Sequence, residues 1–284
     1  MSPLGFALIL AAAFCHATWN FFVKRINAGP ELIWLFSVLS VLIYSPLAIH
    51  FASTFTGFGT KQAFFIAGST ALHLGYLLLL QAGYRKGDLS VVYPTARATG
   101  PMLATGLAVI FLGETLSPTV AAGAAIIILG VMMLTGGDGK TTRPMLASLG
   151  FGVGAGLLIG SYTTWDAHAV STLFIPPLLL EYASGLGRVA LLASTAYGRR
   201  EAIRAIWAEH RIGVLIIAIF NPLAYILVLI ALTFTPVTYV APLRELSVLL
   251  TVLMGSLLLG EGFLPQRLLW AAVILTGVII LTAS

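Results

Sequence analysis

Two short stretches of the chain carry polar and aromatic side chains in a spacing that could form a binding surface. In each stretch the residues stand at i, i+3 and i+4, which places them on one face of a helix. The two sets are His16, Trp19 and Asn20, and Tyr162, Trp165 and Asp166. Aromatic rings can hold an apolar group while the polar atoms beside them hold its polar ends, so these faces predict the binding of a small molecule.

Four more residues of this kind stand in other apolar stretches of the chain. They are His73 and Tyr76, and Asn221 and Tyr225. Positions that face lipid are expected to be apolar, so these polar faces should point inward, toward a central cavity. Two other roles stay open, because Trp and Tyr also occur at the headgroup level and Asn and His also hydrogen-bond neighbouring helices.

Arg97 and Arg244 stand inside equally apolar stretches. A charge in lipid costs ~2.5–3.5 kcal/mol on insertion scales, so each guanidinium must face protein or water. Either of them could hold a carboxylate through a bidentate pair, as could the N-terminal end of a helix. A structural ion pair is the competing role, since Glu245 adjoins Arg244, and Glu181 and Arg188 form a similar pair at i, i+7.

Prolines stand close to both arginines. Pro94 and Pro101 flank Arg97, and Pro242 precedes Arg244. Proline removes a backbone donor and clashes with the preceding turn, so both helices should be bent or broken near their arginine.

The elements that position these residues must be membrane helices. Of the 284 residues, 59% are hydrophobic and 9% are charged, against about 25% charged residues in a soluble domain. The net charge of +5 comes from short connections, and nucleic-acid binding is excluded because no basic stripe or known module is present. Cys15, as the single cysteine, excludes an internal disulfide and a multi-cysteine metal site. The first apolar run lacks a basic leader and is expected to be a retained helix.

Ten stretches are long and apolar enough to cross a bilayer, which needs about 20 residues. They lie near 3–23, 31–52, 62–84, 89–112, 117–136, 145–168, 173–197, 212–233, 237–260 and 264–283. Eleven basic residues belong to the odd-numbered connections, counting Arg267 at the start of the last stretch, and only Lys61 stands in an even-numbered one. Since basic connections stay in the cytoplasm, both termini are predicted to be periplasmic.

The two halves of the chain resemble each other at an offset of 147 residues. This offset aligns Arg97 with Arg244, and "LGE" at 112–114 with "LGE" at 259–261. Each half holds five spans, and an odd number means that the second half enters the membrane from the opposite side. Inverted repeats characterise secondary transporters that bind substrate near the midplane. An intramembrane enzyme has no need of this symmetry, and a channel would require a more continuous polar pore.

The motifs "FLGETLSP" and "LLGEGFLP", each followed by a glycine at Gly130 and Gly277, resemble the EamA-type repeat of the drug/metabolite transporter superfamily. The resemblance covers nearly the whole chain. It implies an inner-membrane carrier, commonly an exporter of amino acids or other small metabolites, and the aromatic stripes look most like those of the amino-acid exporters. We expect Glu114 and Glu261 to cap the helices that follow them, because a carboxylate near a helix N-terminus meets the positive end of its dipole.

The sequence therefore predicts an all-α integral membrane protein of ten transmembrane helices, arranged as two inverted five-helix repeats around a central cavity. The repeats are expected at 1–137 and 145–284. The predicted function is export of neutral or aromatic amino acids by alternating access. Other metabolites or drugs, such as nucleobases and toxic amphiphiles, are the alternative cargo, and an intramembrane lipid-modifying enzyme is the alternative class. No cofactor, metal or nucleic-acid partner is predicted. The partners are a small molecule and the lipid bilayer of a bacterial inner membrane, and the sequence is compatible with a monomer.

Overall fold

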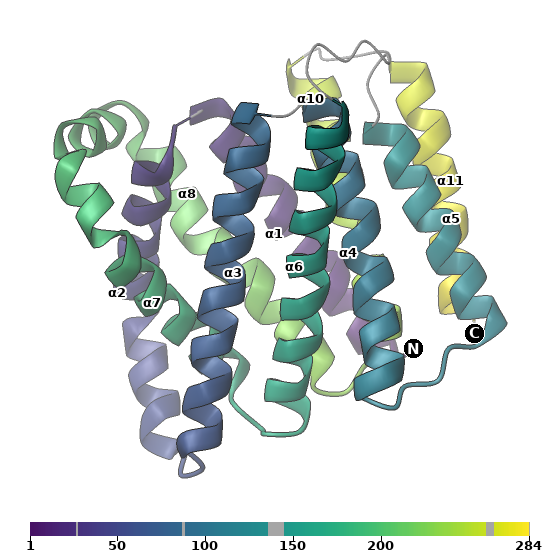
Figure 1. Cartoon of the computed structure of the whole chain (residues 1–284), viewed down its shortest axis with the longest axis horizontal. Coiled ribbons are helices and arrows are strands. Elements are labelled where there is room, and N and C mark those ends of the chain that lie inside the picture. The colour runs from purple at the N-terminus through teal and green to yellow at the C-terminus, as the bar shows by residue number, and fades with distance from the viewer. Residues whose placement is uncertain (27, 87–88, 136–144, 260–263, 284) are drawn as a thin grey trace.

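A computed structural model describes residues 1–26, 28–86, 89–135, 145–259 and 264–283 (Figure 1). Within these ranges all regular secondary structure is helical, as predicted. The helices are α1 (Pro3–Ile26), α2 (Pro30–Thr54), α3 (Thr60–Lys86), α4 (Leu89–Phe111), α5 (Pro118–Thr135), α6 (Met145–Ser171), α7 (Pro177–Gly198), α8 (Arg200–Leu232), α9 (Val237–Leu243), α10 (Leu246–Leu259) and α11 (Leu264–Thr282).

The helices pack in pairs that mirror each other between the two halves (Figure 1). Helix α1 packs against α8, and its counterpart α6 packs against α3, the counterpart of α8. Helix α4 packs against α6 in the same way that α10 packs against α1. The remaining pairs join counterparts directly, since α2 packs against α7 and α5 against α11. This pattern is what a two-fold axis between the halves produces.

Contacts between α5 and α11 show that these two counterparts run antiparallel. A Cβ atom on Gly130 would lie 2.6 Å from Cγ1 of Ile274, and one on Gly277 would lie 2.9 Å from Cγ1 of Ile127. These are reciprocal contacts, because Ile127 and Gly130 correspond to Ile274 and Gly277 at the 147-residue offset. Glycine lets the two backbones approach closely, as small residues do at membrane helix interfaces.

The connections 55–59, 112–117, 172–176 and 233–236 lie at one end of the bundle together with both chain ends (Figure 1). We call this end the terminal face. A Cβ atom on Gly5 would lie 3.4 Å from the Phe234 ring, so the start of α1 meets the connection between α8 and α9 there.

Five described helices are long and apolar enough to cross a membrane: Pro3–Val23, Pro30–Thr54, Thr60–Leu80, Met145–Ser171 and Arg200–Leu232. Two further apolar helices, Pro118–Leu134 and Leu268–Thr282, are shorter. Helix α8 contains a non-helical residue, His210, which separates a surface segment from the apolar part predicted to begin at 212. The count of ten crossings remains a prediction.

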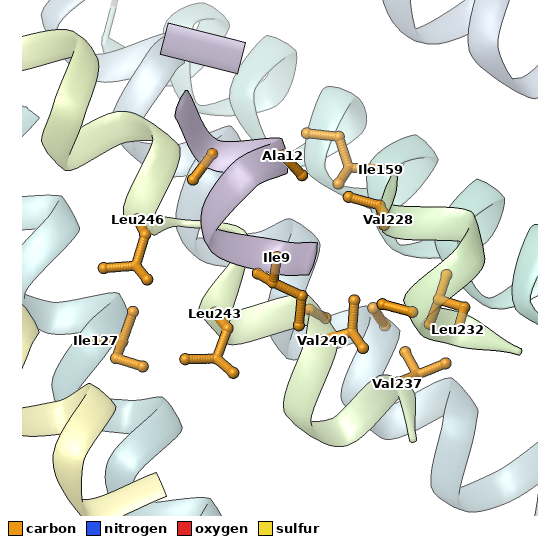
Figure 2. Packing of buried hydrophobic residues seen from close by; sticks show 14 of the residues in the cluster. Ile9, Ala12, Ile127, Ile159, Val228, Leu232, Val237, Val240, Leu243 and Leu246 are labelled. Carbon is orange, nitrogen blue, oxygen red and sulfur yellow. The ribbon is translucent and has the colours of Figure 1, made fainter. Parts of the chain in front are cut away.

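The predicted ninth span is broken at its arginine. Helix α9 ends at Leu243, and α10 begins at Leu246. Figure 2 shows that Val237, Val240 and Leu243 of α9 point into the main hydrophobic core, where each is at most 1% exposed. Helix α4 has no such break, because Leu89–Phe111 continues through Pro94 and Pro101. A lost backbone hydrogen bond is tolerated where neighbouring helices surround it.

Glu114 caps a helix, but not the one predicted. Its two carboxylate oxygens accept hydrogen bonds from the backbone N–H groups of Val237 and Thr238, at 2.7 and 2.8 Å, in the first turn of α9. The expectation that it caps α5 was wrong, because the hydroxyl of Ser117 serves that helix. Gly113, at φ +69°, lies in the left-handed region that glycine adopts without strain, and it turns the chain toward α9. Glu261, the second predicted cap, lies outside the described residues.

Candidate functional site

Six of the twelve predicted site residues meet where α3, α6 and α8 approach the break between α9 and α10. They are His73, Tyr76, Tyr162, Asp166, Tyr225 and Arg244. Pro222 helps to shape α8 in this region. It lacks the N–H that would bond the Ala218 carbonyl, and that carbonyl instead accepts from the Ser40 hydroxyl at 2.8 Å.

Asp166 is the polar centre of this group. It is 0% exposed, although it is ionisable. Its Oδ2 atom accepts from the Tyr225 hydroxyl at 2.5 Å and lies 2.9 Å from Nε2 of His73. Its Oδ1 atom is buried with no hydrogen-bond partner. A buried carboxylate oxygen without a partner is costly, so this atom is available to a donor that enters the site.

Aromatic rings enclose the carboxylate. The Tyr162 ring stacks on the His73 imidazole, with centroids 4.0 Å apart, and Tyr225 meets the same imidazole edge-on at 4.9 Å. Tyr76 approaches Tyr162 at 5.8 Å. These rings offer an apolar surface beside a buried carboxyl group.

Arg244, in the break after α9, supplies a positive charge on the same side. Its Nη1 atom donates to the Thr163 hydroxyl at 3.0 Å, and its guanidinium carbon lies 5.5 Å from the Tyr225 ring centre and 6.0 Å from that of Tyr162. In the described part of the chain no carboxylate lies within ion-pair distance of Arg244. Within the described residues its planar donor set therefore has no carboxylate counter-ion.

Arg97 has the opposite surroundings. Its guanidinium contacts Glu245 at 3.4 Å and the Ser247 hydroxyl at 3.5 Å, and it lies 5.6 Å from the Tyr93 ring centre. Both charged groups are largely buried, with side-chain exposures of 16% and 3%. The contact joins the first repeat to the second. It gives Arg97 a structural ion pair, which was one of the two roles that the sequence left open for this residue. Glu181 and Arg188 also form an ion pair, at 2.6 Å.

The predicted stripe on α1 bonds mainly within its own helix. The Trp19 indole N–H donates to Nδ1 of His16 at 3.0 Å, and the Asn20 amide donates to the His16 carbonyl at 2.7 Å. Nε2 of His16 is buried with no hydrogen-bond partner. Asn221 is half-buried on α8 beside Pro222.

Trp165 turns toward α3. Its indole N–H donates to the Phe65 carbonyl at 2.8 Å, and its ring stacks on Phe65 with centroids 4.3 Å apart. Gly68 leaves room for this ring, since a Cβ atom there would lie 2.4 Å from it. These contacts are those of a packing residue, and they place Trp165 on the other side of α6 from Arg244.

A cleft of about 360 Å³ opens at the terminal face. Three connections, 112–117, 172–176 and 233–236, line it together with the helix ends beside them. Its polar groups include Glu114, His168, Ser171 and Thr235, and Ala167, the neighbour of Asp166, is part of its wall. None of the twelve predicted residues lines this cleft. The sequence did not predict this cleft, because its walls are helix ends from both repeats. The sequence also did not predict the contact of Thr163 with Arg244, since the only indication was the position of Thr163 three residues before Asp166.

Among the described residues no group of three potential metal ligands comes together. The arrangement instead offers a carboxylate, a guanidinium and aromatic rings, which can bind a small molecule with both charges and an apolar part. Such a site suits recognition and movement of cargo between two helix repeats.

Comparison with known proteins agrees with this architecture. The model of the EamA-like transporter family matches residues 3–136 and again 146–283. A solved crystal structure, described only as that of a protein, superposes with a TM-score of 0.78 at 12% sequence identity, covering 100% of this chain and 98% of the other. At that identity the likeness concerns the fold alone. No curated protein matches the chain significantly. Since both halves match the family model over nearly their whole length, the chain belongs to the EamA-like transporter family.

Proposed function

We propose that this membrane transporter exports neutral amino acids, aromatic or aliphatic, by alternating access. The observation that carries the proposal is Arg244, a mostly enclosed guanidinium beside the Tyr162 and Tyr225 rings with no carboxylate partner in the described chain. A substrate carboxylate can supply that partner through two parallel hydrogen bonds. The rings then accept the apolar side chain of the same molecule.

Charge accounting favours a neutral zwitterion over an acidic substrate. An acidic substrate would need several cations, but Glu245 already neutralises Arg97. That leaves Arg244 as the cation of the described site. Aromatic surfaces discriminate weakly between apolar groups, so selectivity among neutral amino acids should be broad. The same property keeps other flat or amphiphilic metabolites as alternative cargo.

The arrangement in the membrane follows from the basic connections. We propose ten crossings of a bacterial inner membrane, with the odd-numbered connections in the cytoplasm and both termini in the periplasm. The cleft at the terminal face then opens toward the periplasm. This is the state from which an exporter would release its cargo.

Counterflow in proteoliposomes tests the proposal. Vesicles loaded with unlabelled leucine or phenylalanine should transiently concentrate the labelled amino acid, and the rate should saturate with concentration. A channel would give neither counterflow nor saturation. A screen of all amino acids by thermal shift would choose the probes, and the absence of stabilisation and counterflow for every neutral amino acid would contradict the proposed cargo.

A further inference from the structure

We propose that Asp166 is the second anchor of the substrate, holding its α-ammonium group, and that a proton on the Asp166–His73 pair competes with this ammonium. Export would then be coupled to proton entry. The inference rests on the proposed function, because it concerns the same site and the same zwitterionic cargo. It goes further in naming the residue that couples transport to a driving force.

The first support is the unequal use of the two carboxylate oxygens. Oδ2 of Asp166 is bonded by Tyr225 and adjoins His73, whereas Oδ1 is buried with no hydrogen-bond partner. Burying a charged oxygen without a donor is unfavourable by several kcal/mol. A donor that reached Oδ1 would remove this cost, and both an ammonium group and a proton can act as that donor.

The second support is the position of the opposite charge. The Tyr225 hydroxyl bonds Asp166, while Arg244 lies 5.5 Å from the centre of the same ring. Arg244 also donates to Thr163, one helical turn before Asp166 on α6. The cation and the anion therefore lie around a single tyrosine ring. This separation suits the two charged ends of one amino acid with its side chain on the rings.

The third support is the charge balance of the site. Titratable and charged groups from six parts of the chain interact with it: His16 on α1, His73 and Tyr76 on α3, Tyr93 and Arg97 on α4, Tyr162 on α6, Tyr225 on α8, and Arg244 and Glu245 in the break. With both histidines neutral and both acids ionised, the two arginines cancel Asp166 and Glu245. A bound zwitterion preserves that balance, but a bound proton removes the charge that attracts the ammonium. Proton and substrate therefore exclude each other.

Mutual exclusion gives antiport. Ala167, the neighbour of Asp166, lines the cleft at the terminal face. In the proposed orientation a proton would approach the pair from this side and displace the ammonium group. At the cytoplasmic side the next substrate displaces the proton. Each cycle moves one proton inward and one zwitterion outward, so one positive charge enters per molecule exported.

Proton release on binding tests this directly. Phenylalanine is added to purified protein in weakly buffered solution containing a pH indicator, across pH 5 to 8, the range in which histidine exchanges protons. We expect the protein to release up to one proton per bound phenylalanine in the acidic part of that range. As a matched ligand, 3-phenylpropanoate lacks the ammonium, and it should bind more weakly and release none. Binding of phenylalanine without proton release at any pH would overturn the inference.

Two variants assign the effect to the pair. Asp166→Asn should bind phenylalanine about tenfold more weakly, the loss of one charged partner, and should release no proton. Glu209→Gln, which removes an exposed carboxylate on α8, is the control and should behave as wild type. Proton release by Asp166→Asn equal to that of wild type would contradict the assignment.

A third variant keeps the inference testable if Asp166→Asn does not fold. His73→Gln retains the carboxylate but removes the imidazole of the pair, so phenylalanine accumulation driven by a pH gradient should fall more than phenylalanine counterflow does. Wild-type accumulation in this variant would exclude His73 from the coupling. Missing counterflow in the wild-type protein would instead reject the proposed function, whereas counterflow without any response to the pH gradient would reject only the coupling.

Discussion

At the scale of single residues, Arg97 and Arg244 occupy matching positions in the two repeats but have different partners. Glu245 falls on Ala98 at the 147-residue offset, so only the second repeat has an acid directly after its arginine. That acid pairs with Arg97 across the repeat boundary and not with its own neighbour in sequence. Arg244 is therefore the stronger candidate for binding a substrate carboxylate.

Exchange of each arginine for lysine should separate these roles. Arg244→Lys keeps the charge but loses the planar donor set. It should therefore weaken the binding of phenylalanine about tenfold and the binding of phenylalaninamide much less. Arg97→Lys is the matched control, and it should affect acid and amide equally. The measurement is competition by each compound in the counterflow assay. If Arg244→Lys weakened the binding of the acid and the amide equally, this arginine would have a structural role and would not bind the substrate carboxylate.

Trp165 provides a second residue-scale prediction. Trp165→Ala removes a ring that stacks on Phe65 and bonds its carbonyl. The cavity left behind should cost about 3–5 kcal/mol of stability, as Trp→Ala changes do in packed cores. We expect a lowered melting temperature in detergent, with unchanged phenylalanine affinity in the fraction that remains folded. Normal stability together with a loss of phenylalanine affinity would show that Trp165 is part of the binding surface.

The sequence indicated which residue types would be inside but not which would meet. The i, i+3, i+4 spacing placed Tyr162, Trp165 and Asp166 on one helix, yet Tyr162 and Asp166 contact His73 while Trp165 contacts Phe65. Phe65 and His73 both belong to α3, so this face of α6 meets one neighbouring helix at two heights. Which residue of α3 lies opposite each side chain depends on the shift of the two helices along their axes, which residue spacing does not contain.

At the scale of elements, the break between α9 and α10 was predictable and the partner of Glu114 was not. Pro242 beside an enclosed arginine indicated the break, which the structure contains. Glu114 follows α4 and precedes α5, and spacing alone favoured the nearer helix. The carboxylate instead accepts hydrogen bonds from the N–H groups of Val237 and Thr238 in the first turn of α9.

Loss of this cap should destabilise the protein. Glu114→Ala removes a charged acceptor from two backbone donors at the start of a helix. This should lower the free energy of unfolding by about 1–2 kcal/mol. Glu209→Ala removes a carboxylate from the surface and serves as the control. Thermal unfolding in detergent should show a lower midpoint for the first variant only. Identical midpoints would mean that α9 is held by its core contacts alone.

The glycines between α5 and α11 allow a matched pair of substitutions. A Cβ atom on Gly123 would lie 2.7 Å from the Leu281 backbone nitrogen and 2.9 Å from the Gly277 carbonyl oxygen, whereas Gly106 on α4 has nothing within 4 Å. Gly123→Ala should therefore destabilise the protein, because backbone atoms cannot give way as flexible side chains can. Gly106→Ala should stabilise it by up to about 1 kcal/mol through helix propensity. Equal effects of the two substitutions on the unfolding midpoint would contradict the close antiparallel contact.

At the scale of the whole molecule, the duplicated chain explains the helix pairings. A repeat of five spans predicted an inverted second half, and the antiparallel contact of α5 with α11 is consistent with it. The sequence did not predict which helices would be neighbours. That pattern depends on small residues opposing large ones across the symmetry axis, such as Gly130 against Ile274.

Membrane orientation is a prediction at this same scale. A reporter that is active only in the cytoplasm, fused after Ser284, should be inactive, because the basic connections lie at the other end of the bundle. The same reporter placed in the surface segment before His210 should be active. Full activity of the fusion after Ser284 would reverse the proposed orientation and turn the cleft toward the cytoplasm.

The central claim is that one site holds both charged ends and the apolar side chain of a neutral amino acid. Counterflow of labelled phenylalanine into proteoliposomes, with unlabelled phenylalanine, phenylalaninamide and 3-phenylpropanoate as competitors, tests it most directly. The account predicts strong competition by phenylalanine and at least about tenfold weaker competition by each analogue, since each lacks one charged contact. Equal competition by all three would contradict it, because the rings alone would then be recognising the cargo.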